Sequence, residues 1–137
     1  MKKVLMPFLL LLSLGCATHR HNTAASYPVN GTWITIKMVM DGKEMPASFY
    51  AHQKLLIEDT AYTFTAESVD KGIIRYSGNK MDIYGEEGVN IGKHFTALFK
   101  QESGLLSICY NLSGDAYPAS FETKSKPYYF LAVFKKA

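Results

Sequence analysis

The chain of 137 residues lacks the motifs of the common enzyme classes. It contains no Gly-x-Ser-x-Gly nucleophile elbow, no phosphate-binding glycine loop, no HExxH zinc motif and no CxxC pair. A catalytic function would therefore depend on residues that the sequence does not mark. We predict that the protein is not an enzyme, and we assign no residue to a cofactor or a metal.

An excess of charge of one sign is also lacking. The chain has 15 Lys and Arg against 12 Asp and Glu, and Lys2 and Lys3 are two of the 15, so the remainder is nearly neutral. No run of basic residues alternates with aromatic ones, which is the pattern of a nucleic-acid-binding surface. The sequence therefore excludes nucleic acid as an expected partner.

One long apolar run stands at the N-terminus. Lys2 and Lys3 precede residues 4–12 (VLMPFLLLL), and small residues follow up to Gly15. This is the three-part pattern of a secretory signal. The run is too short to span a bilayer, because a membrane-crossing helix needs about 20 residues. We predict that residues 1–15 are a signal peptide.

Residues 12–16 (LSLGC) resemble a lipobox, the processing site of bacterial lipoproteins, although Ser13 stands where an aliphatic residue is more common. The resemblance implies cleavage before Cys16 and acyl chains such as palmitate on that residue. Several chains, each contributing about 0.8 kcal/mol per buried methylene, anchor a protein stably. The resemblance also implies a lipid-anchored protein of the cell envelope. Ala17 after the cysteine suggests the outer membrane, with the domain facing the periplasm.

Cysteine is scarce, since Cys109 is the only one besides Cys16. If Cys16 carries lipid, no intramolecular disulfide can form. A reactive thiol needs a nearby base or positive charge, and neither is visible in the sequence around Cys109. We therefore expect a buried, inert thiol.

Residues 16–29 are interpreted as the lipidated cysteine and a tether to the folded domain at 30–137. Residues 17–29 are small and polar and show no periodicity, and they could reach about 40 Å at full extension. His19 and His21 could alternatively form a metal site. We favour the tether because no third ligand lies nearby.

From Gly31 onward the pattern is that of β-structure. Short stretches rich in Val, Ile, Tyr, Phe and Thr alternate with Gly, Asn and Asp turn signals. A helical turn is expected after Pro46, and residues 112–127 form a longer loop. Strands in hairpin order without a long helix favour an all-β, eight-stranded up-and-down antiparallel barrel over a sandwich. The expected strands are 31–40, 53–59, 61–68, 71–77, 79–85, 93–101, 104–111 and 128–135.

Strand alternation predicts a large, aromatic inward face. A barrel of eight strands can fill its centre with side chains or hold one small ligand. Arg75 could supply a buried guanidinium for a carboxylate head group; the opposite orientation, with Ile74 and Tyr76 inside, is more apolar, and we favour it. The candidate ligand-binding residues are Tyr62, Phe64, Arg75, Met81, Ile83, Phe95, Phe99, Leu106, Ile108, Tyr110 and Phe130.

Gly31-Thr32-Trp33 resembles the Gly-x-Trp signature of lipocalins and fatty-acid-binding proteins. The resemblance implies that Trp33 closes one end of the barrel and stacks on a basic side chain of the last strand, here Lys135 or Lys136 in place of the usual Arg.

The domain as a whole is similar to an uncharacterised family of lipocalin-like bacterial domains first noted in planctomycetes. That similarity implies a calycin-type barrel and brings no catalytic residues. The matching segments are Gly31-Thr32-Trp33, Asp41-Gly42-Lys43 with Pro46, Met81-Asp82-Ile83, Ile91-Gly92-Lys93, Leu106 to Tyr110, Pro118 with Phe121, and Leu131 to Lys135.

Three other groups of polar residues could carry chemistry, and for each we favour a plain structural role. Asp41, Glu44 and His52 could form an acid/base set, but we favour a polar turn followed by a helical segment. Glu86 and Glu87 precede a glycine and fit a solvated turn better than a metal site. His94 is placed on the outer face of its strand.

Two functions fit these observations. The first is a lipid-anchored barrel that binds a small hydrophobic or amphipathic molecule. The second is a structural or interaction lipoprotein with a filled barrel and no ligand, whose working surface would be the loops 43–52 and 112–127. Analogy of fold favours the first, and the protein partner of the second is not identified by the sequence.

Overall fold

The structure is a computed structural model that describes residues 27–137. The expected signal peptide at 1–15, the lipidation site at Cys16 and most of the tether lie outside the described residues. Within the described residues no helix is both long enough and apolar enough to cross a membrane.

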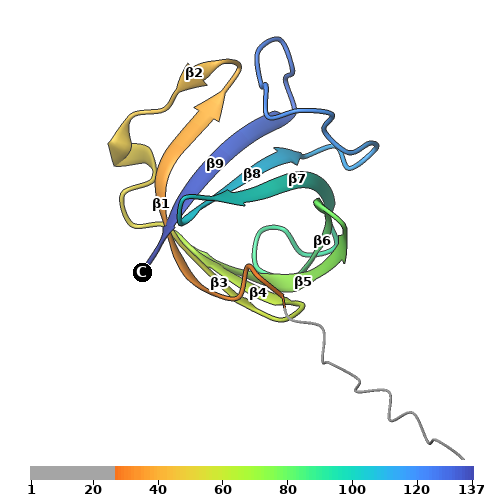
Figure 1. The fold of residues 1–137 in the computed structure, drawn as a ribbon. Coiled ribbons are helices and arrows are strands. Elements are labelled where there is room, and N and C mark those ends of the chain that lie inside the picture. Colours follow the sequence, from red (N-terminus) through yellow and green to blue (C-terminus); the bar gives the residue numbers. More distant parts are fainter. Residues whose placement is uncertain (1–26) are drawn as a thin grey trace, which may run out of the picture.

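The described residues form nine strands and one short helical turn, which succeed one another around a closed ring (Figure 1). Each strand pairs antiparallel with the next strand of the barrel, and β1 also pairs with β9, which closes the sheet. The expected all-β, eight-stranded up-and-down barrel is confirmed, with β2 as one additional strand. The elements are β1 (Gly31–Met40), β2 (Lys43–Glu44), η1 (Ala47–Phe49), β3 (Lys54–Glu58), β4 (Ala61–Thr65), β5 (Val69–Ser77), β6 (Lys80–Glu87), β7 (His94–Glu102), β8 (Leu105–Asn111) and β9 (Tyr129–Lys136).

The elements differ from expectation mainly at turns. Asp41 and Gly42 both have positive φ, at 48° and 70°, and they fold the chain back so that Lys43 pairs with Met40. This two-residue turn creates β2, because Asp-Gly suits the backbone of a tight hairpin. The helical turn η1 follows Pro46 as expected. Strand β5 begins at Val69, two residues before its expected start, and this adds Asp70 to the sheet.

One end of the barrel is closed around Trp33, which is completely buried. Its indole Nε1 donates a hydrogen bond of 2.8 Å to the carbonyl of Val29. The ammonium of Lys136 lies 4.5 Å from the indole ring centroid and donates to the carbonyl of Asn30. Lys136 is therefore the basic side chain that stacks on the tryptophan. The side chain of Lys135, one position along the strand, is on the outer face.

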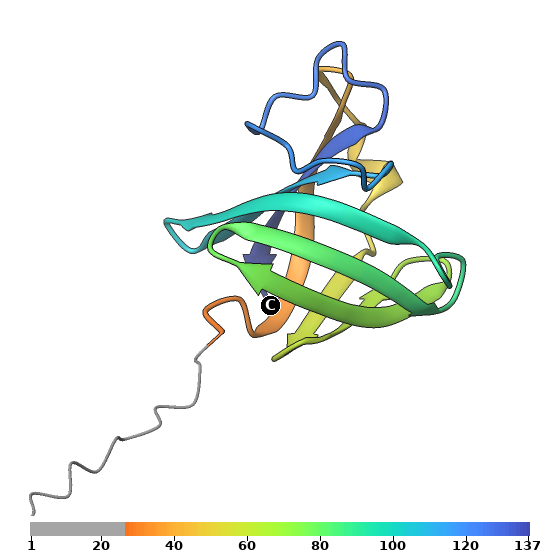
Figure 2. The same ribbon diagram turned by 90° about the vertical axis from the view of Figure 1, so that its right-hand side faces the viewer.

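The first and last described residues both lie at this closed end (Figure 2). The ring of Tyr27 lies 5.1 Å from that of Tyr76 between centroids, and the amide of Ala137 donates to the carbonyl of Thr32 over 2.9 Å. The long connections stand at the opposite end.

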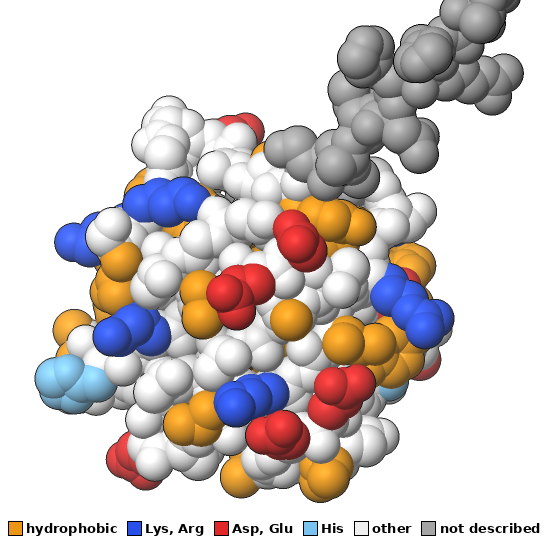
Figure 3. Space-filling model, turned by 90° about the horizontal axis from the view of Figure 1, so that it is seen from below, with side chains coloured by type: hydrophobic (Ala, Val, Ile, Leu, Met, Phe, Trp, Pro, Cys, Tyr) orange, Lys and Arg blue, Asp and Glu red, His pale blue; other side chains and the backbone are white. Residues whose placement is uncertain are grey.

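The longest connection, residues 112–128, packs against the outside of the barrel and the β1–β2 turn. The amide of Gly42 donates to the Thr123 hydroxyl over 3.0 Å, and the amide of Ser125 donates to the Asp41 carboxylate over 2.8 Å. On the face seen in Figure 3, acidic and basic side chains separate small groups of apolar ones.

Candidate ligand-binding cavity

The barrel is hollow. A cavity of about 580 Å³ lies between its walls, within the range of about 300–1,000 Å³ that is typical of small-molecule sites. Side chains from the loops at the open end line it, among them Gln53, Lys93 and Tyr128, so the mouth lies opposite Trp33. Most of the lining is apolar: Met38, Leu55, Phe64, Ile74, Met81, Ile83, Phe95, Ile108, Leu112, Phe130, Ala132 and Phe134. The polar lining consists of Gln53, Tyr62, Asp70, Asn90, Lys93, Tyr110 and Tyr128.

Eight of the candidate residues meet at this cavity. They occupy alternate positions of five strands, and because neighbouring side chains on a strand point to opposite faces, they reach the interior together. These residues are Tyr62, Phe64, Met81, Ile83, Phe95, Ile108, Tyr110 and Phe130.

Arg75 does not reach the cavity, which corrects its placement among the candidate ligand-binding residues. It is exposed on the outer wall, and its guanidinium carbon lies 5.4 Å from the ring centroid of Tyr84. Ile74, its neighbour, is buried and lines the cavity. The reason is the cost of burying a charge without a partner, which the more apolar pair Ile74 and Tyr76 avoids.

Phe99 and Leu106 also do not line the cavity, although both lie on inward-facing strand positions. Leu106 is completely buried in the core. Phe99 packs edge-on against Tyr76, with ring centroids 6.0 Å apart, and Tyr76 in turn contacts Tyr27 at the closed end. These side chains fill the barrel below the cavity. Alternation identifies the face of a strand, but not the depth along the barrel axis.

Two aromatic contacts shape the wall. Tyr110 and Phe130 stack with ring centroids 4.4 Å apart and an interplanar angle of 13°. Burial raises the pKa of Tyr110, and the nearby Tyr62 adds to this. Tyr62 lies against the backbone of Gly72, where a Cβ would stand 2.7 Å from a ring carbon of Tyr62. The glycine thus makes room for the tyrosine ring.

Asp70 places a carboxylate just inside the mouth. The residue is 5% exposed, and one carboxylate oxygen accepts a hydrogen bond of 3.2 Å from the amide of Asn90. Gly88 packs so closely on Asp70 that a Cβ would lie 2.4 Å from that oxygen. The pKa of Tyr62 is raised by burial first, and then by the negative charges of Asp70 and Glu86. Asp70 was not among the candidates, because Asp70-Lys71 has the composition of a turn.

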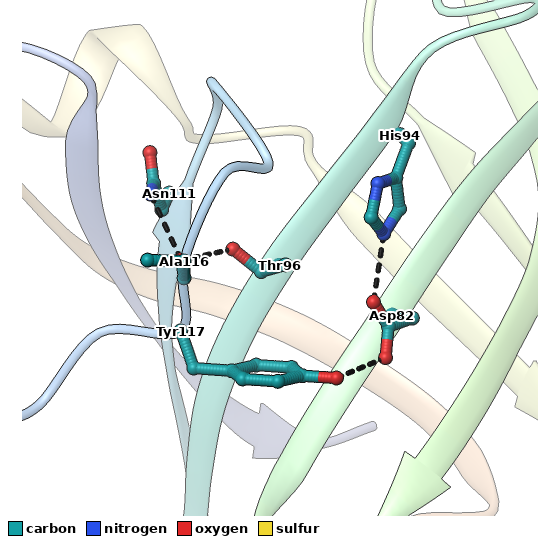
Figure 4. A network of polar contacts seen from close by, with 6 residues as sticks. All are labelled: Asp82, His94, Thr96, Asn111, Ala116 and Tyr117. Carbon is teal, nitrogen blue, oxygen red and sulfur yellow. Dashed lines mark hydrogen bonds and ion pairs between the residues drawn. The ribbon is translucent and has the colours of Figure 1, made fainter.

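A second polar network lies on the outer wall (Figure 4). The carboxylate of Asp82 forms a hydrogen bond of 2.7 Å with His94 Nε2 and accepts a second one from the hydroxyl of Tyr117. Partial burial acts to raise the pKa of Asp82, but the hydrogen bonds from Tyr117 and His94, with the charges of His94 and Arg75, outweigh it and lower that pKa. The hydrogen bond to Asp82 raises the pKa of Tyr117.

The network fastens the 112–128 connection to the barrel. The carbonyl of Ala116 accepts hydrogen bonds from the Thr96 hydroxyl at 2.6 Å and from the side-chain nitrogen Nδ2 of Asn111 at 2.9 Å. The ring of Tyr84 stacks on His94 with 4.6 Å between centroids. His94 thus lies on the outer wall, as expected. Because these contacts join the connection to β6 and β7, we interpret the network as a latch that holds the connection in place.

The other polar residues singled out in the sequence do not converge on one site. Asp41 caps the backbone at Ser125, Glu44 lies 3.8 Å from the ammonium of Lys37, and His52 is exposed. Glu86 and Glu87 are exposed at the end of β6. Across residues 27–137, no three His, Cys, Asp or Glu side chains are grouped as metal ligands would be.

Cys109 is buried on the outer side of β8. Burial raises the pKa of its thiol to about 11, with a smaller contribution from the charge of Glu122. The thiolate is therefore scarce at neutral pH.

No protein-family model, curated protein or solved structure is significantly similar to this chain.

Proposed function

We propose that this chain is a lipid-anchored lipoprotein of the bacterial cell envelope whose barrel binds one small hydrophobic or amphipathic molecule. The observation that carries the binding role is the cavity of about 580 Å³, enclosed by apolar and aromatic side chains with a few polar groups near its mouth. This is the composition of small-molecule sites in general. A barrel that served only as a scaffold would be expected to fill this space, because protein interiors are close-packed.

The proposed anchor rests on the signal-like segment, the lipobox resemblance and Cys16. Tyr27, where the described chain begins, lies at the closed end, whereas the mouth is at the opposite end. Cys16 precedes Tyr27 by 11 residues, which span at most about 40 Å. The mouth then opens away from the point at which the tether joins the barrel, so that a ligand can be exchanged with the aqueous compartment or with a partner. Outer-membrane placement, facing the periplasm, remains part of the proposal.

The anchor is tested by metabolic labelling of the full chain in a bacterial host with a clickable palmitate analogue. Wild type should incorporate the label, and Cys16→Ser should not. Equal labelling of both chains would refute the lipidation proposal.

The binding role is tested on residues 17–137, which include every strand of the closed barrel. Native mass spectrometry of this chain purified from cells, followed by fluorescence titration with the neutral probe N-phenyl-1-naphthylamine, should show one molecule bound per chain.

The blocking variant is Ala132→Trp, since Ala132 is buried on β9 and lines the cavity. The matched control is Ala61→Trp at an exposed position of β4. Ala132→Trp should bind the probe at least about tenfold more weakly than wild type, and Ala61→Trp should bind it with the affinity of wild type. Equal binding by both variants would place the probe outside the cavity and refute the proposal.

A further inference from the structure

Among residues 27–137 Asp70 is the only buried residue of the Asp, Glu, Lys, Arg and His types; the other buried polar residues are threonines and an asparagine. No Lys, Arg or His of the described chain forms an ion pair with it. A carboxylate taken out of water is costly unless a counter-charge or several hydrogen bonds compensate it. Here one oxygen receives a single hydrogen bond, from the amide of Asn90.

The surroundings of Asp70 are those of a site for an organic cation. Asp70 lines the cavity beside Tyr62 and Phe64, and it pairs directly with Phe64 across strands β4 and β5. Aromatic faces attract cations, and a carboxylate forms its strongest hydrogen bonds with charged donors. The apolar wall beyond these residues can take an alkyl or aryl body.

The other charged residue of the cavity is Lys93, and it is exposed. Its ammonium is solvated and screened, so its attraction for an anion is weak. A buried guanidinium, which would favour a fatty-acid carboxylate, is absent from the described interior because Arg75 points outward. The buried charge that can select the head group of a ligand is therefore the negative charge of Asp70.

We propose that the cavity prefers cationic amphiphiles, molecules with an amine head group and an apolar body, and that Asp70 binds the ammonium. This inference rests on the proposed binding function and narrows its ligand class. The ammonium lies at the Asp70 carboxylate just inside the mouth, and the apolar body extends toward Met81 and Ile108. Fatty acids are disfavoured, because their carboxylate would be brought beside that of Asp70.

The test compares three ligands with the same chain length, namely dodecylamine, dodecanol and dodecanoate, each kept at pH 7 below the concentration at which it aggregates or separates from water. They compete with N-phenyl-1-naphthylamine on residues 17–137. We expect dodecylamine to bind at least about tenfold more tightly than dodecanol or dodecanoate, because its ammonium can form a charge-assisted hydrogen bond with Asp70 in a partly dry site.

Two variants separate the charge from the structural role of Asp70. Asp70→Asn removes the negative charge but keeps an oxygen that can accept the hydrogen bond from the Asn90 amide. This variant should lower the affinity for dodecylamine by about tenfold and change the affinity for dodecanol by no more than about twofold. The control is Glu58→Gln, which removes an exposed carboxylate of β3 that does not line the cavity and should leave the preference for the amine unchanged. Circular dichroism verifies that both variants are folded.

The outcomes distinguish this inference from the proposed function. Equal affinities for the three ligands, tighter binding of dodecanoate, or an unchanged amine affinity in Asp70→Asn would refute the cation preference and leave the binding role standing. If neither the probe nor any of the three ligands binds, the binding function fails, and the inference fails with it.

Discussion

Replacement of Trp33 by phenylalanine should destabilise the barrel far more than the loss of ring size alone would suggest. Trp33 is completely buried at the closed end, and its indole N–H donates to the carbonyl of Val29, which is itself a buried residue. Phenylalanine keeps an aromatic ring at this position but has no donor, so the carbonyl loses its partner. The same change weakens the contact with the ammonium of Lys136.

The magnitude follows from these contacts. A buried polar group left without its hydrogen bond costs about 1–3 kcal/mol, and a cation–π contact at a partly exposed site contributes about 0.5–1 kcal/mol. We therefore expect Trp33→Phe to lower the free energy of unfolding by about 1.5–4 kcal/mol. This is a large share of the roughly 5–15 kcal/mol that holds a domain of this size. Lys136→Met removes both the cation–π contact and the hydrogen bond to the carbonyl of Asn30, and should cost about 1–2 kcal/mol.

The measurement is urea unfolding of residues 17–137 followed by far-UV circular dichroism, because Trp33 is the only tryptophan and its fluorescence is lost in the variant. The midpoint should fall while the dependence on urea stays the same, which marks a change in stability without a change in the surface exposed. A loss below about 0.5 kcal/mol for Trp33→Phe would show that the indole hydrogen bond does not support the closed end.

Two further predictions concern the wall of the barrel. Ionised Asp82 should stabilise the fold above its ordinary pKa of 3.8, and this contribution should be lost as the pH falls through the lowered folded-state pKa. Asp82→Asn should thus cost about 1 kcal/mol at pH 7 and almost nothing near pH 2; a deficit in thermal unfolding that is the same at both pH values would contradict this. Gly72→Ala should prevent stable folding or cost at least about 3 kcal/mol, because its Cβ would stand 1.9 Å from the carbonyl oxygen of Tyr84. Gly104→Ala, where a Cβ meets nothing within 4 Å, should cost only about 1 kcal/mol for its positive φ; equal losses in chemical denaturation would show that the close approach at Gly72 is unimportant.

The lining of the cavity could largely be predicted from the sequence, whereas the latch formed by Asp82, His94 and Tyr117 could not. Residues such as Met81 and Ile83 could be assigned to the interior from the sequence because alternation along a strand is a local property of the backbone. The hydrogen bond between Tyr117 and Asp82 joins residues 35 positions apart. It exists only because the 112–128 connection folds back along the outer wall, and no local pattern contains that path.

What the sequence by itself determined is the β class, the hairpin order and most of the inward face. Short alternating strands separated by turn signals such as Asp41-Gly42 leave few other ways to bury their apolar sides. The tertiary structure decided where along the barrel each inward side chain lies, so that Phe99 closes the floor while Phe95 lines the cavity. It also decided which charges lie inside: β5 begins early enough to bring Asp70 into the wall, and the face that it turns inward carries Asp70 and Ile74, which leaves Arg75 outside. Depth and orientation depend on strand register and on the packing of distant loops, which are properties of the closed sheet and not of any one segment.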